Sequence, residues 1–232
     1  MARRLYDLCG ADPARRFSPY CWRARLALAH KGLEVETVPW RFTDRAVIAA
    51  HGAEKVPVLL DGSRAVADSW AIAEYLEDSY PDRPSLFGGE GGRALAKFIN
   101  GWADAVMIAG IARLVVSDIP PLLDPADRDY FVTSREKRFG MPLAQVTADR
   151  ETRVVAFRES LIPLRLVLRG RPFLHGDAPA YADAIAFGPL QWARCVSAFS
   201  LLAQDDPVHA WRDRMLSAYG GIARAAPAFA GA

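Results

Sequence analysis

The chain has 232 residues, of which 51% are hydrophobic and 24% charged, a composition that excludes a disordered polymer and suits one large or two small folded domains. Its 29 basic and 27 acidic side chains leave a formal net charge of +2 without a sustained basic run, so we expect no nucleic-acid partner. The first residues lead directly into a strand-like run, and no uninterrupted apolar stretch reaches about 18 residues. We therefore expect a cytoplasmic protein without a membrane span.

The cysteine and histidine patterns fit neither a metal site nor a disulfide framework. Cys9, Cys21 and Cys195 form no CxxC pair, and the four histidines show no HxxxH spacing. Isolated cysteines in a reducing compartment stay free thiols. We expect no metal, and we expect Cys9 and Cys21 to be structural.

Residues 4–80 alternate between strand and helix patterns. Leu5–Leu8 is a short apolar run. Ser18-Pro19 opens a helix, because serine is a favoured N-cap and proline fits the first helical position. Gly32 stands in the usual glycine position after a helix C-terminus. Residues 33–38 then alternate with a period of two, which predicts a strand.

A hairpin and a further helix complete this half. Asp61-Gly62 is a turn signal between two apolar runs within residues 56–66. Asp68-Ser69 then starts a helix that ends before Pro81. A loosely helical stretch lies between the second strand and the hairpin, so the order predicts a small mixed sheet covered by helices.

The stretch Pro81–Gly92 contains two prolines and four glycines, which predicts a linker. After it the strand pattern disappears, and apolar residues recur at helical spacing between Leu95 and Val106. Pro163 is expected to kink or interrupt one of the later helices. The other predicted helices cover residues 125–139, 150–169, 180–200 and 207–219.

Three stretches carry the functional signal: Ser18–Gly32, Lys55–Leu59 and Asp68–Leu76. Each also has an ordinary structural explanation, as a helix cap, a proline at a strand start and a second helix cap. Together and in this order they resemble the serine-type glutathione S-transferase family, over nearly the whole chain. The resemblance implies the cytosolic glutathione transferase fold (α/β + all-α), with a thioredoxin-like glutathione-binding domain over residues 1–82 and an all-α domain over residues 93–232.

The resemblance gives Ser18 the catalytic role, and the physical chemistry of a helix N-terminus agrees with it. A free thiol has a pKa of about 8.5, so only a few per cent of it is thiolate at neutral pH. The N-terminus of a helix and a hydroxyl donor both stabilise an anion placed there. The alternative is that Ser18 only caps the helix.

The other two stretches would hold the tripeptide. By resemblance Pro57 is cis, so that Val56 presents an extended backbone edge to glutathione. Ser69 and nearby N–H groups would hold the γ-glutamyl carboxylate, and Asp68 would pair with the ammonium group, helped by the partner subunit. Lys55 is expected at the glycyl end.

The resemblance implies that the helical half shapes the acceptor pocket. It places Trp102, Met107 and Trp192 on the helices that border this pocket. Residues of these types are more often part of a hydrophobic core. The segment His175–Asp183 resembles the family's folding element before a buried helix. It departs from the family at Ala180, where Ser or Thr is usual, so the hydroxyl half of the capping box is missing. Asp183 can still accept hydrogen bonds from backbone N–H groups.

Within the family, the chain is most similar in character to bacterial glutathione-dependent β-etherases, which cleave aryl ethers in lignin-derived compounds. This similarity implies detoxification or aromatic compound catabolism by a homodimer, with glutathione as co-substrate and a small hydrophobic, aromatic substrate. General conjugation, isomerisation, dehalogenation and a non-catalytic carrier of hydrophobic ligands remain alternatives. The stretches that support the β-etherase similarity are Leu5–Leu8, Ser18–Arg23, Asp68–Trp70 and Asp127–Tyr130.

Other residues have competing explanations. Tyr6 lies in the first strand, where other transferase classes keep a catalytic tyrosine, but Ser18 occupies the serine-type position and Tyr6 is expected to pack. Arg15 and Arg16 either raise the positive potential near Ser18 or lie in a solvated loop. The sign of the charges alternates from Asp127 to Arg138, which predicts an exposed helix face.

Overall fold

The computed structural model describes residues 3–229, and its first half is built on one mixed sheet. The strand order is β2-β1-β3-β4, with β1 parallel to β2 and antiparallel to β3. β3 and β4 form the predicted hairpin. The strands are β1 (Arg4–Leu8), β2 (Glu36–Trp40), β3 (Val58–Asp61) and β4 (Arg64–Ala67).

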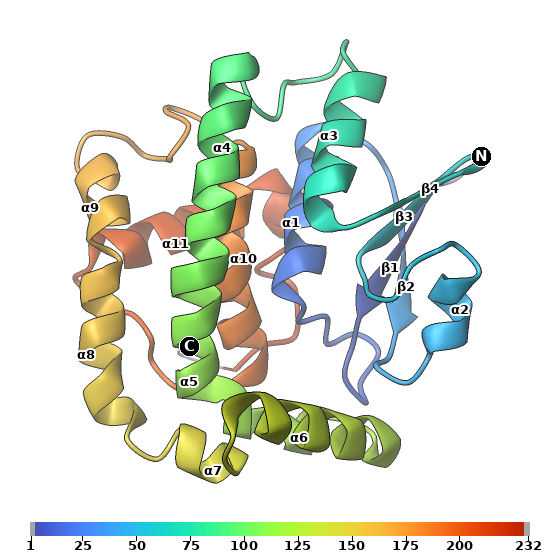
Figure 1. The fold of residues 1–232 in the computed structure, drawn as a ribbon. Coiled ribbons are helices and arrows are strands. Elements are labelled where there is room, and N and C mark those ends of the chain that lie inside the picture. Colours follow the sequence, from blue (N-terminus) through green and yellow to red (C-terminus); the bar gives the residue numbers. More distant parts are fainter. Residues whose placement is uncertain (1–2, 230–232) are drawn as a thin grey trace.

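Three helices cover this sheet: α1 (Pro19–His30), α2 (Arg45–Ala49) and α3 (Ser69–Ser79). Figure 1 shows α1 and α3 between the sheet and the helical half, and α2 on the outer side of the sheet. This arrangement confirms the predicted thioredoxin-like half and puts the N-termini of α1 and α3 beside the second half of the chain.

The second strand begins at Glu36 rather than at residue 33, where the sequence pattern predicted it. The reason is how α1 ends. Gly32 is left-handed with φ +62°, its N–H donates to the Ala29 carbonyl at 3.0 Å, and the Leu33 N–H donates to the Leu28 carbonyl at 3.0 Å. These two bonds form a Schellman motif, which commits the buried Leu33 to closing the helix.

As predicted, the regular elements of the second half are helices throughout the part of it that the structure describes, together with short 3₁₀ turns and the π-helical segment η1. The predicted helix over 150–169 is interrupted at Leu161, and Pro163 lies in the first turn of the helix that follows, so the expected effect of this proline is confirmed. The helices are α4 (Glu90–Trp102), η1 (Ala103–Ile108), α5 (Ala109–Val115), α6 (Pro125–Phe139), α7 (Leu143–Val146), α8 (Arg150–Ser160), α9 (Ile162–Leu168), α10 (Tyr181–Val196) and α11 (Pro207–Ser217).

α10 is the buried centre of the molecule and packs directly on α1. Gly188 permits this close approach: a Cβ at this position would lie 2.5 Å from the Pro19 carbonyl oxygen. Asp183 stabilises the start of α10 without the missing hydroxyl, since its carboxylate accepts from the backbone N–H groups of Leu174, His175 and Ala180 at 2.8–3.2 Å. The predicted substitute for the capping box is therefore confirmed.

The continuous helical run Glu90–Asp118 joins α4, η1 and α5. By length and composition alone it could cross a membrane, with a mean hydropathy of 1.4 in its most apolar window. Its inner residues Ala103, Met107 and Ile111 are fully buried in the fold. Figure 1 shows the run standing against α10, and both α4 and η1 contact that helix, so one face of the run packs inside the folded protein.

Candidate functional site

Ser18 is the N-cap of α1 and is buried except for 4% of its surface. Its Oγ accepts a hydrogen bond from the Cys21 N–H at 3.2 Å, so the capping interpretation describes a real contact. A hydroxyl that accepts this capping bond still carries one proton of its own to donate. Since Pro19 has no N–H, the Tyr20 amide is the free backbone donor in this first turn. Capping and anion binding are therefore compatible here.

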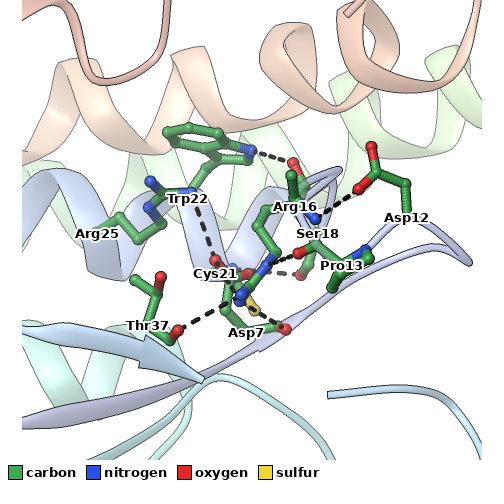
Figure 2. A network of polar contacts seen from close by, with 10 residues as sticks. Asp7, Asp12, Pro13, Arg16, Ser18, Cys21, Trp22, Arg25 and Thr37 are labelled. Carbon is green, nitrogen blue, oxygen red and sulfur yellow. Dashed lines mark hydrogen bonds and ion pairs between the residues drawn. The ribbon is translucent and has the colours of Figure 1, made fainter. Parts of the chain in front are cut away.

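The loop before Ser18 is held against β1 by a buried charge network (Figure 2). Asp7 is fully buried and forms ion pairs with Arg25 at 3.5 Å and Arg16 at 3.8 Å. Arg16 also donates to the Pro13 carbonyl at 2.6 Å, and its own carbonyl accepts from the Trp22 indole at 3.0 Å. The network fixes the backbone from which α1 starts.

Burial is the largest influence on the pKa values of the titratable groups in and beside this network. Burial raises the pKa of Asp7 above its ordinary value, although the guanidinium groups of Arg25 and Arg16 lower it. Burial raises the pKa of the Cys21 thiol well above its ordinary value, and burial also raises the pKa of the Cys9 thiol. Both cysteines are buried free thiols, which fits the structural role expected for them.

The edge next to β3 has the geometry needed to pair with a peptide. The Val56–Pro57 peptide bond is cis, the isomer that the resemblance implied. β3 begins only at Val58, and in the described part of the chain the Val56 N–H and C=O take no part in the turn and loop hydrogen bonds. Val56 therefore offers one backbone donor and one acceptor. Lys55 is exposed beside it.

The start of α3 lies directly against this edge, because the Asp68 N–H donates to the Pro57 carbonyl at 3.2 Å. Asp68 has φ +80°, which is rare for a residue with a side chain. One oxygen of its carboxylate, Oδ1, accepts from the N–H groups of Trp70 at 2.9 Å and Ala71 at 3.1 Å. In residues 3–229 the other oxygen has no hydrogen-bond partner, so it is available to a cation.

Ser69 is buried at the first position of α3, and its carbonyl accepts from the Tyr181 hydroxyl at 2.7 Å. The start of α1 reaches the same region through β1. β1 pairs with β3 as far as Tyr6 and Val58, which lie two residues along the chain from Leu8 and from Val56. The Phe17 N–H donates to the Leu8 carbonyl at 3.3 Å. The start of α1 is thus linked through Leu8 to β1, and the start of α3 is linked through the Pro57 carbonyl to the residue before β3.

Sequence reasoning missed Arg23, which joins this site to the helical half. Its guanidinium is completely buried and contacts the Ile185 carbonyl at 3.2 Å, Asn100 Oδ1 at 3.1 Å and Asp104 Oδ1 at 2.9 Å. It also stacks on the ring of Tyr20 at 5.0 Å. Asp104 is part of the π-helical segment η1, a rare backbone form that occurs frequently at functional sites.

The three residues predicted at the acceptor pocket lie in different environments. Met107 in η1 is completely buried, which favours the core interpretation for it. Trp102 is half-buried at the end of α4. Trp192 is one turn beyond Gly188, and hence on the face of α10 that touches the first turn of α1.

The observed contacts narrow the roles that the sequence left open for Arg15, Arg16 and Tyr6. Arg15 Nη1 donates to the Cys195 carbonyl at 2.7 Å, and Arg16 is buried, so a solvated loop is wrong for Arg16. Tyr6 packs with its ring 5.8 Å from that of His51.

The predicted exposed face of α6 is wrong at Asp127. This buried carboxylate accepts from the backbone N–H groups of Phe42 and Thr43 and from the Thr43 hydroxyl, at 2.8–3.2 Å. Among residues 3–229, no group of three or more His, Cys, Asp or Glu side chains could hold a metal ion.

The fold and the site geometry define a thioredoxin-like protein with a helical second half. The family profile described as "Glutathione S-transferase, N-terminal domain" matches residues 13–84, and the profile described as "Glutathione S-transferase, C-terminal domain" matches residues 94–216. The chain belongs to the glutathione S-transferase family, whose members use glutathione.

Individual relatives agree with this assignment. The glutathione S-transferase-like protein ustS of Aspergillus flavus is 32% identical over 145 residues, an alignment that covers 56% of this chain and 51% of ustS. The crystal structure of glutathione transferase GSTFuA3 from Phanerochaete chrysosporium superposes with a TM-score of 0.77 and 28% identity, covering 97% of this chain and 94% of that one. A glutathione S-transferase of Ceriporiopsis subvermispora, solved in complex with glutathione, shares the fold with a TM-score of 0.81, 23% identity and coverages of 95% and 97%.

Proposed function

We propose that this glutathione S-transferase uses Ser18 to stabilise the thiolate of bound glutathione, which then attacks a hydrophobic electrophile. The observation that carries the proposal is the position of the Ser18 hydroxyl at the N-terminus of α1, where its oxygen accepts the capping bond and its own proton can be donated to an anion. Lowering a thiol pKa by two units requires about 2.7 kcal/mol of preferential thiolate stabilisation. One charge-assisted hydrogen bond together with the helix dipole supplies about that much.

Glutathione would lie along the edge formed by the cis Pro57. Val56 pairs with the peptide backbone, Ser69 and the N-terminus of α3 hold the γ-glutamyl carboxylate, and Lys55 meets the glycyl carboxylate. The free oxygen of Asp68 pairs with the ammonium group. The left-handed backbone of Asp68 supports this role, because strain of this kind concentrates at ligand-binding positions.

The test is the ultraviolet absorbance of glutathione thiolate, bound to the wild-type protein and to Ser18→Ala, recorded across pH. We expect a lowered thiol pKa in the wild type and a rise of about one unit or more in the variant, since one hydroxyl donor to an anion is lost. The matched control is Ser63→Ala, which removes an exposed hydroxyl from the turn between β3 and β4, at the far end of the hairpin from Pro57. It should behave as wild type.

An unshifted thiol pKa in the wild type would contradict the catalytic role of Ser18. If glutathione still binds in that case, Ser18 serves only as a helix cap and the carrier alternative replaces the enzyme. Loss of glutathione binding in Ser18→Ala with an unchanged fold, by contrast, would give Ser18 a role in affinity rather than in thiol ionisation.

For the acceptor we propose a small aromatic compound, with β-aryl ethers as the first substrates to screen. The thiolate would attack the carbon that carries the ether oxygen, forming a C–S bond, and the aryloxide would leave with the electron pair of the C–O bond. Conjugation, isomerisation and dehalogenation begin from the same thiolate and are distinguished by their products. Trp102, Met107 and Trp192 are proposed to border this acceptor pocket.

We also propose two domains, at residues 1–82 and 93–232, and a cytoplasmic homodimer. Leu95 and Phe98 support the dimer: they lie three residues apart on α4 with 68% and 74% of their surfaces exposed, an unusual cost for a monomer. Light scattering should give the mass of two chains for the wild type and a shift toward one chain for Phe98→Glu. A monomeric wild type would contradict the dimer and leave the thiolate chemistry standing.

A further inference from the structure

Helix α6 connects residues of the first half with α5 of the second half. Figure 1 shows it at the bottom of the view, below both the sheet and α5. In its first turn the Asp127 carboxylate accepts from the Phe42 and Thr43 N–H groups at 3.2 and 3.0 Å. At its far end the Phe139 ring lies 5.7 Å from the Arg113 guanidinium of α5. α6 therefore runs from the residues after β2 to α5.

An aromatic cluster joins the inner face of α6 to the start of α1. The Phe42 ring lies 5.7 Å from that of Phe131 on α6 and 6.3 Å from that of Phe17, the residue before Ser18. The Arg135 guanidinium lies on the α6 side of this cluster, 5.4 Å from the Phe42 ring and 4.8 Å from the Phe131 ring. Along this path two aromatic rings link Arg135 to Ser18.

Arg135 is a partly buried cation, and within residues 3–229 it forms no ion pair with a carboxylate. Its Nη1 donates to the Ser134 hydroxyl oxygen at 2.9 Å. Burial lowers the pKa of Arg135, the charge of Arg138 lowers it as well, and Tyr130 raises it. Arg23, by contrast, has a carboxylate oxygen 2.9 Å away. A cation withdrawn from water is costly without a counter-ion, so a ligand carboxylate would stabilise Arg135 through two parallel N–H···O bonds.

Arg138 lies one helical turn beyond Arg135, and its charge acts on the first turn of α1. Tyr20 is in that turn, and its ring lies 5.0 Å from the Arg23 guanidinium. Burial and the charge of Asp104 raise the pKa of the Tyr20 hydroxyl, whereas the charges of Arg23 and Arg138 lower it. The positive charge of α6 therefore extends toward the place where the thiolate is proposed to form.

The carboxylates near these two guanidinium groups already have partners. Asp104 pairs with Arg23 at 2.9 Å. Asp68 caps α3 through one oxygen, and its other oxygen is proposed to hold the ammonium group of glutathione. Glu136 Oε1 accepts from the Leu143 N–H at 3.0 Å. These carboxylates therefore leave the positive charge of α6 uncompensated, which favours an anionic acceptor.

We propose that Arg135, assisted by Arg138, binds a carboxylate of the acceptor, so that the protein selects acidic aromatic electrophiles over neutral ones. The inference rests on the proposed function, because it requires glutathione beside Ser18 and an acceptor between α1 and α6. The planar guanidinium of Arg135 meets a carboxylate with two parallel donors, while its stacking on the aromatic rings keeps it in place. Arg138 is exposed and adds long-range attraction.

Two glutathione conjugates that differ only in the charge of the acceptor group test the proposal. One carries a nitrobenzoate ring on its sulfur, and the other carries the matching nitrobenzamide ring. Both bring the same tripeptide, so the ratio of their dissociation constants, measured by titration calorimetry on the full chain, reports the acceptor group alone. We expect the wild type to bind the carboxylate conjugate about tenfold more tightly, which is the effect of one charge-assisted hydrogen bond.

Variants of α6 assign the preference to a residue. Arg135→Gln should bring the ratio to about one, whereas Arg135→Lys keeps the charge and should keep part of the preference. Arg138→Gln should lower the ratio about twofold, because solvent and salt screen an exposed charge. The matched control is Lys137→Gln, which removes the same charge from an exposed position of the same helix. It should leave the ratio at the wild-type value.

A wild-type ratio of about one, with both conjugates bound, would overturn the proposal whether or not the variants fold, and it would leave the thiolate chemistry standing. Equal weakening of both conjugates by Arg135→Gln would also overturn it, because Arg135 would then hold a carboxylate of glutathione itself. An equal drop of the ratio in Lys137→Gln and Arg135→Gln would reduce the preference to diffuse attraction and overturn it too. Failure of both conjugates to bind would instead contradict the glutathione edge, so the two proposals fail in different ways.

Discussion

Each end of α1 is anchored by a buried basic side chain, but the two side chains have partners in different parts of the molecule. Near its start, Arg23 is completely buried and reaches across to α10, α4 and η1 with three contacts of 3.2 Å or less. At its end, Lys31 is equally buried but pairs at 2.6 Å with Glu77 of α3, within the first half of the chain. The first anchor joins the two halves, whereas the second fastens a helix to its neighbour.

This difference indicates where the molecule requires precise geometry. The start of α1 carries Ser18, and the π-helical segment that provides Asp104 also carries Met107, which is proposed to border the acceptor pocket. A rigid guanidinium with several fixed donors can set the spacing between these two parts, which a single flexible ammonium does less well. We infer that Arg23 positions the thiol site relative to the second half.

Replacement of Arg23 by methionine should have the largest effect on stability. It leaves the Asp104 carboxylate without its cation and the Ile185 carbonyl and Asn100 side chain without a donor, at a cost of about 3 kcal/mol. Urea unfolding at a fixed protein concentration measures this loss. Arg23→Met combined with Asp104→Asn should recover part of it, because no unpaired charge is left.

A loss below about 1 kcal/mol in Arg23→Met would remove the proposed contrast between the two ends of α1, since it would place Arg23 within the range of an ordinary surface pair. In that case the contacts between α1 and α10, where Gly188 lies against Pro19, would have to hold the halves together by packing alone.

Much of the fold was predictable because local patterns carry it. The Ser18-Pro19 start, the glycine end of α1 and the Asp61-Gly62 hairpin all depend on residues close in sequence, and the structure reproduces them. The strand predicted over 33–38 was misplaced because the same residues fit two structures. Leu33 fits both the first position of a period-two strand and the end of a Schellman motif.

The contacts between the halves were not predictable in this way. Arg23 and Asp104 are far apart in sequence, as are Asp127 and Thr43, and the three charged residues look like ordinary surface charges on amphipathic helices. Only the packing of α1 and α6 against the other half shows that Arg23 and Asp127 are buried. The sequence pattern around Asp68 predicted a helix start. It did not predict the positive φ of Asp68, because a standard N-cap with an ordinary backbone has the same sequence pattern.

The Lys31–Glu77 pair should give the smallest effect, visible mainly as a change with pH. Burial by itself raises the pKa of Glu77. The hydrogen bonds from the Leu86 N–H, Lys31 and Ser85 together outweigh this effect, so the pKa lies below its ordinary value of 4.5. The folded protein therefore favours the carboxylate, and this stabilisation is present above about pH 4.5 and lost as the pH falls through the folded-state pKa. Glu77→Gln should cost less at neutral pH than Arg23→Met, because the amide keeps an oxygen that can still accept from Lys31. Urea unfolding from about pH 6 down to about pH 3.5 should show the wild type losing its advantage over the variant. A difference that stays constant over that range would mean that Glu77 acts through neutral hydrogen bonds alone, and the end of α1 would then be anchored without charge.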